Sequence, residues 1–215
     1  MLDYDREIAL QAFPARVRPA FLALWNLDLA FADVVSTSSD PRLAAIRLAW
    51  WRERLTELDE GKAPPPEPRL QAVARDLLPR NLGGHELSRL EDSWLPLLAS
   101  FPWGAEQIEA LKGRGRLLFD IGARLLGGDP TDAETAGELW SLEDGAMHCS
   151  DLASRQLLRS EALRIERLGR VPRPLRPLTV LGALAIINIL EPASGVARGM
   201  AALHHRATGR FSHRS

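Results

Sequence analysis

The chain has 215 residues, the length of one ordinary domain, and 46% of them are hydrophobic, which is enough for a buried core. Its formal net charge of −1 excludes a strong overall attraction to nucleic acid or to anionic lipid. The charge is unevenly distributed, because residues 155–215 hold 11 arginines against three acidic residues, and this basic third either contacts phosphate groups or faces the acidic remainder of the fold.

Helical periodicity runs through the sequence, and no segment shows the alternation typical of a strand. The first predicted helices cover residues 3–13, 19–35 and 41–60. The third has a strong start signal, because Asp40 is a good N-cap residue and Pro41 suits the first helical position. The proline-rich stretch 63–68 cannot be helical and is predicted to be an extended connector.

Further helices are predicted over residues 69–78, 84–100, 105–127, 132–165, 178–190 and 194–208. Thr131 and Glu134 form a capping-box pattern at the start of the helix over 132–165. The run Lys112–Arg116 suits either a phosphate-binding turn or a plain helix, and the lack of a preceding strand favours the helix. The pattern as a whole predicts an all-α protein with a single domain over residues 1–215.

Cysteine content and hydropathy indicate the compartment. The single cysteine, Cys149, excludes an internal disulfide and suits a reducing cytoplasm. The start of the chain lacks the pattern of a signal peptide. The longest near-apolar run, residues 178–190, is too short at 13 residues to span a bilayer. We therefore expect a cytoplasmic protein with at most peripheral contact at the membrane surface.

Three stretches of the sequence carry a resemblance to a known family. They are the run PARVRPAFLALW at residues 14–25, the segment with Arg47 and Trp50–Arg52 that leads into the proline-rich connector, and the small-residue segment 115–126 with Ala136–Gly137. Together they resemble the squalene/phytoene synthase family over roughly residues 10–190. The resemblance implies the all-helical isoprenoid synthase fold, shortened here on the C-terminal side.

The family joins two prenyl diphosphates head to head, and its chemistry requires two acidic clusters that hold Mg²⁺ against the diphosphate. Matched to the family pattern, the first-cluster aspartates fall on Ala32 and Ser36, and only Asp33 remains of that cluster. The leading aspartate of the second cluster falls on His148 and its later acid on Asp151. The resemblance therefore implies a degenerate metal site.

Two further departures point the same way. The family's N-terminal serine and tyrosine, which help to hold the diphosphate, fall on Asp3 or Asp5 and on Glu7, where carboxylates would repel an anion. The segment Asn26–Ala30 is similar to the complex I assembly factor branch of the superfamily, whose metal motifs are also degenerate.

Six residues are candidates for a remnant pocket: Asp28, Asp33, Arg52, Asp144, His148 and Asp151. Asp28 lies on the apolar stripe of its helix, so we expect it to be buried and either to pair with Arg47 or Arg52 or to line a pocket. Asp144, His148 and Asp151 are spaced i, i+4, i+7 on one predicted helix. Their common face suits either a weak divalent-metal site or a solvated polar surface.

These observations favour a non-catalytic protein, a pseudoenzyme that binds a partner protein or an isoprenoid-type lipid and needs no metal or other cofactor. The alternative is a residual prenyltransferase of terpenoid or carotenoid biosynthesis. Its reduced Mg²⁺ site would be built from Asp28, Asp33, Asp144 and Asp151. Neither hypothesis includes a nucleic-acid partner.

Overall fold

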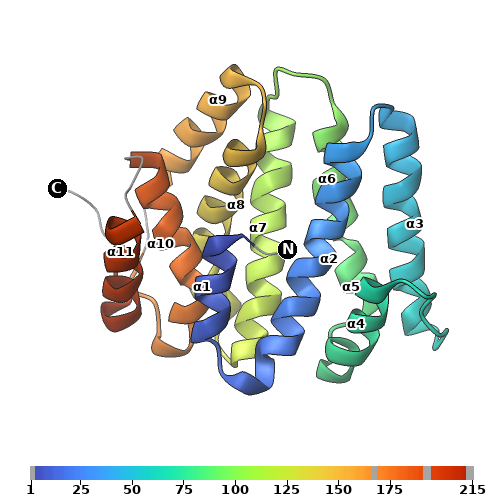
Figure 1. Ribbon diagram of the computed structural model, residues 1–215, viewed down its shortest axis with the longest axis horizontal. Helices are drawn as coiled ribbons and strands as arrows, with labels where there is room; N and C mark the ends of the chain where they lie inside the picture. Colours follow the sequence, from blue (N-terminus) through green and yellow to red (C-terminus); the bar gives the residue numbers. More distant parts are fainter. Residues whose placement is uncertain (1–2, 166–168, 191–194, 212–215) are drawn as a thin grey trace. The chain divides into compact units, whose positions relative to one another are not determined.

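The computed structural model describes residues 3–165, 169–190 and 195–211, and the regular structure of these residues is helical (Figure 1). The predicted all-α class is confirmed. The helices are α1 (Tyr4–Ala12), α2 (Arg18–Thr37), α3 (Pro41–Asp59), α4 (Pro68–Asp76), α5 (Gly84–Ser88), α6 (Leu90–Trp94), α7 (Ala105–Leu126), α8 (Glu134–His148), α9 (Leu152–Leu163), α10 (Arg176–Leu190) and α11 (Gly195–Thr208).

Contacts along the chain divide it into two compact units. One unit is Pro14–Ser100 and contains α2 to α6. The other combines Asp3–Phe13 with Phe101–Ser215 and contains α1 and α7 to α11. The single domain over residues 1–215 stays a prediction.

In the Pro14–Ser100 unit, α2 carries the apolar stripe expected from its sequence. Phe21, Leu24 and Phe31 are fully buried, whereas Val35 near the helix end is half-buried. The Phe31 ring centroid lies 6.0 Å from that of Trp51 on α3. Because burial of such side chains stabilises by about 1.5–3 kcal/mol each, this stripe holds α2 in the unit.

The predicted start of α3 is confirmed, and so is the proline-rich connector except at Pro68, which is helical. The Asp40 carboxylate accepts the backbone N–H of Arg42, and Pro41 is the first helical residue. Residues 63–67 are not helical, and α4 begins at Pro68. Prolines suit these positions, since they lack the N–H that the first turn of a helix leaves unpaired.

The predicted helix over residues 84–100 is wrong as a single element, because the structure divides it into α5, α6 and a 3₁₀ turn at Leu95–Leu98. The Arg89 N–H bonds three residues back to Glu86, which interrupts the α-helical pattern. Pro96 has no N–H with which to continue α6.

In the other unit, two glycines allow α7 and α8 to approach closely. A Cβ atom on Gly115 would lie 2.2 Å from the Gly137 carbonyl oxygen, and one on Gly137 would lie 2.5 Å from the Gly115 carbonyl oxygen. Both distances are shorter than any atom pair tolerates, so larger residues would push the helices apart. Helix α8 also packs on α9 and α10, and α10 contacts α1 and α11.

The predicted helix over residues 132–165 is also wrong as a single element. Helix α8 ends at His148, and Cys149 adopts an extended backbone with φ −77° and ψ 128°. Asp151 then caps α9, because its carboxylate accepts the N–H and the hydroxyl of Ser154. The capping box at Thr131 is wrong too, because Thr131 lies in a 3₁₀ turn and Ala133 precedes α8 without a side-chain cap.

Two helical segments, Ala15–Thr37 and Arg173–Leu190, have the length and apolar composition of a membrane span. This corrects the sequence estimate, which counted only the uninterrupted run 178–190. More than half of the most apolar window of each segment is buried inside the protein, as in the core helices of soluble proteins.

A buried histidine fastens α11 to α10. His205 contacts the Thr179 hydroxyl through Nε2 at 2.9 Å and the Arg210 carbonyl through Nδ1 at 3.1 Å. The Phe211 ring packs against the imidazole in a tilted arrangement, with centroids 4.6 Å apart. Burial lowers the pKa of His205 to about 4, although the Arg210 carbonyl acts in the opposite direction.

We expect the stability of the protein to fall as the pH drops from about 6.5 to 4, because the unfolded chain then binds a proton that folded His205 excludes. Urea unfolding at pH 7.5 and pH 5 should differ by about 2 kcal/mol through this residue. A His205→Gln variant should lose that part of the difference. Asp5 and Glu143, whose raised pKa values act in the opposite sense, are the same in both proteins. An equal pH dependence in both proteins would contradict this role of His205.

Candidate functional site

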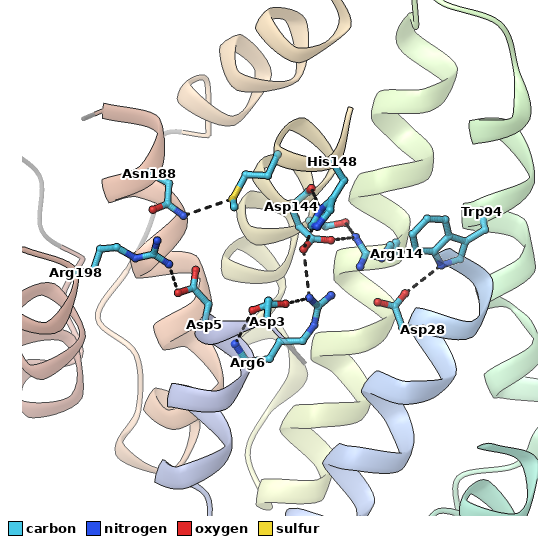
Figure 2. A network of polar contacts seen from close by, with 12 residues as sticks. Asp3, Asp5, Arg6, Asp28, Trp94, Arg114, Asp144, His148, Asn188 and Arg198 are labelled. Carbon is cyan, nitrogen blue, oxygen red and sulfur yellow. Dashed lines mark hydrogen bonds and ion pairs between the residues drawn. The ribbon is translucent and has the colours of Figure 1, made fainter. Parts of the chain in front are cut away.

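Asp144, one of the predicted site residues, lies on α8 in the unit that contains α1 and α7 to α11 (Figure 2). Its carboxylate accepts a hydrogen bond from Arg114 on α7 at 2.7 Å, and Arg6 on α1 lies 3.4 Å away. The consecutive helices α7 and α8 and the distant α1 therefore meet at one carboxylate.

Both arginines are removed from water, with exposed fractions of 2% for Arg6 and 1% for Arg114. Each guanidinium lies 4.8 Å from the ring centroid of Trp140, one turn before Asp144 on α8. Arg6 also pairs with Asp3, the N-cap residue of its own helix. The aromatic ring and the carboxylates compensate for the loss of water around the two cations.

The electrostatics of Asp144 follow from this arrangement. Burial alone would raise its pKa, but the charges of Arg6 and Arg114 outweigh burial and lower the pKa to about 2. Asp144 is therefore ionised at neutral pH and is already paired with cations. Two unit charges about 4 Å apart interact by about 4 kcal/mol at an effective dielectric constant of 20. A divalent cation at Asp144 would therefore be strongly repelled by the two guanidinium groups.

A cavity of about 150 Å³ opens beside this cluster, within the same unit. Asp144, Trp140 and Asp5 line it together with Asn188 and Arg198. Asp5, one of the residues at the family's diphosphate-holding positions, pairs with Arg198. Burial raises the pKa of Asp5, and Arg198 opposes that shift.

The structure does not place Asp144, His148 and Asp151 on one helix face, so that prediction is wrong. His148 is exposed, and its Nδ1 lies 2.8 Å from the Asp144 carbonyl oxygen. Asp151 lies beyond the end of α8 and caps α9, and its hydrogen bonds with Ser154 lower its pKa. Among the described residues no group of three or more His, Cys, Asp or Glu side chains is arranged to hold a metal ion.

Asp28 is fully buried, as expected, but neither of the expected arginines is its partner. Its carboxylate accepts the indole N–H of Trp94 at 3.0 Å (Figure 2). Arg52 instead pairs with Glu91 at 3.0 Å, and Arg47 is exposed.

Asp33, the surviving acid of the first cluster, lies on the surface of the Pro14–Ser100 unit. It pairs with Arg69 at 2.6 Å, and both side chains are partly exposed to water. Such pairs contribute little to stability, commonly less than about 1 kcal/mol.

Sequence reasoning missed Arg6 and Arg114 as site residues. Arg114 lies in the run Lys112–Arg116, and the structure confirms the helical interpretation of that run. Helical periodicity could have indicated that Arg114 is buried, because it lies three residues after Leu111 and four before Leu118 on the inner face of α7. Arg6 gave no comparable signal, since α1 is short and its polar residues are numerous.

Comparison with known proteins agrees with the fold and with the N-terminal motifs. The sequence model of the squalene/phytoene synthase family matches residues 2–83. No curated protein and no solved structure matches the chain. The match and the all-helical architecture, which is consistent with the isoprenoid synthase fold, support the membership of this chain in the squalene/phytoene synthase family.

Replacement of Asp144 by asparagine should destabilise the protein by about 3 kcal/mol, because two buried arginines would lose their shared anion. The measurement is a urea unfolding curve at neutral pH. Asp33→Asn is the matched control, since it breaks an ion pair on the surface and should cost less than about 1 kcal/mol. Addition of Arg114→Met to Asp144→Asn should recover part of the loss. Equal effects of the two single variants would show that Asp144 is well solvated.

Proposed function

We propose that this chain is a non-catalytic squalene/phytoene synthase-like protein that acts by binding a partner protein. The observation that carries the proposal is the pairing of Asp144 with Arg6 and Arg114. A site that stabilises a leaving diphosphate through Mg²⁺ needs carboxylates that are free to bind the metal. Here the carboxylate nearest the expected second cluster has two guanidinium groups as its counterions.

The other three acids that a reduced Mg²⁺ site would need are engaged as well. Asp28 accepts a hydrogen bond from Trp94, Asp33 pairs with Arg69, and Asp151 caps α9. Replacement of even one charge-stabilising group typically costs a catalytic site about 3 kcal/mol, so the loss of several removes turnover.

Two observations favour a partner protein over an isoprenoid-type lipid. The cavity beside Asp144, about 150 Å³, is smaller than the roughly 300–1,000 Å³ typical of small-molecule sites, so this particular cavity does not suit an isoprenoid chain. Helix α3 also exposes Leu43, Ile46 and Trp50, which follow one another at i, i+3 and i+7 and therefore share a face. Exposed tryptophan and neighbouring arginines are typical of the residues that dominate protein interfaces.

With farnesyl or geranylgeranyl diphosphate and Mg²⁺, the purified protein should release no pyrophosphate above background. Mg²⁺ alone should leave its melting temperature unchanged, because we expect the ion not to bind. A bound ligand at 100 times its dissociation constant would instead add about 2.7 kcal/mol to the stability. Mg²⁺-dependent turnover that Asp144→Asn or Asp28→Asn abolishes would instead establish the residual prenyltransferase.

Substitution on the exposed face of α3 should disrupt partner binding. Ile46→Glu places a charge in the apolar stripe and should weaken the captured complex at least about tenfold, as expected for loss of a buried apolar side chain at an interface. The measurement is affinity capture with cross-linking, followed by titration of the identified protein. Leu163→Glu, a similar exposed change on α9, should bind normally. A partner that both variants retain, or that both lose, would argue against the α3 face.

A further inference from the structure

Helix α11 exposes an apolar stripe to solvent. Val196, Met200 and Leu203 have exposed fractions of 76%, 67% and 64%. Their spacing of i, i+4 and i+7 places them on one side of the helix. Three large apolar side chains so exposed on one face are more than the scattered surface residues that need no explanation.

The opposite side of α11 is fixed to the rest of its unit, so the exposed stripe is not a loose core face. Ala201, Ala202 and His205 are buried, and α11 packs beside α10 (Figure 1). Arg176 of α10 donates to the carbonyl oxygens of the last turn of α11, at Arg206 and Ala207. The helix is therefore held with its apolar stripe outward.

The surroundings of the stripe are basic. Helix α11 contains no acidic residue. Arg206 follows Leu203 by one turn, and Arg210 lies just beyond the helix end; both are exposed. In the described part of the chain neither forms an ion pair with a carboxylate. Arg170, which donates to the Thr208 carbonyl, adds a third positive charge at this end.

On the side away from this stripe, α11 contacts α1 through Arg198. Tyr4 on α1 is exposed, and the guanidinium of Arg198 on α11 lies 5.8 Å from its ring centroid. Arg198 itself pairs with Asp5 and so does not add to the net charge.

We propose that the α11 face, defined as Val196, Met200, Leu203, Arg206 and Arg210, docks onto the anionic surface of a lipid bilayer. The apolar stripe enters the boundary between headgroups and acyl chains, while the arginines contact lipid phosphates. The same chemistry disfavours a second copy of this chain as the occupant, because α11 offers no carboxylate to pair with the arginines. This inference is independent of the non-catalytic role.

The full-length protein should sediment with phosphatidylcholine vesicles that contain about one third phosphatidylglycerol, and much less with phosphatidylcholine alone. Raising the salt from about 0.1 M to about 0.5 M should release it, because salt screens the contacts of the arginines. The paired change Met200→Glu and Leu203→Glu should reduce partitioning more than about tenfold. Arg206→Gln and Arg210→Gln should each reduce it about fivefold.

Leu163→Glu on α9 is the matched control, since it adds the same charge at a similarly exposed leucine and should leave vesicle binding unchanged. If the variant with Met200→Glu and Leu203→Glu does not fold, the two arginine variants still test the proposal. Equal binding to neutral and anionic vesicles would overturn the proposal, as would binding that the α11 variants do not alter. A dimer in solution that Met200→Glu dissociates would assign the face to self-association instead.

Discussion

The ion cluster at Asp144 is the interaction on which the unit around α7 and α8 depends. It places two guanidinium groups and a carboxylate in the interior, where each ion loses several kcal/mol of hydration. Trp140 and the close helix packing at Gly115 and Gly137 keep the partners near enough to compensate for that loss. A smaller set of contacts would leave a charge unpaired, so α1, α7 and α8 are fixed together.

The same cluster is balanced in charge, because Arg6 and Arg114 pair with Asp3 and Asp144. A magnesium site is a region of excess negative charge, created by carboxylates that have no cation of the protein's own. Around Asp144 the protein supplies the cations, and Asp5 in the neighbouring cavity likewise has Arg198. Asp144 and Asp5 are therefore balanced by arginines of the protein itself.

Signals within a few residues of one another predicted the helices well, but they could not predict which side chains pair over long distances in the sequence. Caps and prolines, such as Asp40 with Pro41, fix helix starts through contacts within a few residues, so the sequence pattern was sufficient there. The break after His148 was missed because a single extended residue, Cys149, interrupts an otherwise helical composition. The acceptor role of Asp28 toward Trp94 joins positions 66 residues apart, and periodicity indicates only that Asp28 is buried.

The position of α1 has a consequence for biosynthesis. Arg6 meets Asp144 across 138 residues of intervening chain, and α1 packs on α10, which lies further along still. At ribosomal rates of about 5–20 residues per second, Arg6 is synthesised roughly 7 to 30 seconds before Asp144. During that interval Arg6 has Asp3 of its own helix but not Asp144, and α1 lacks α10 to pack on. Residues 14–100, which lie between them in the sequence, contain a core of their own and can fold before the partners of α1 are synthesised.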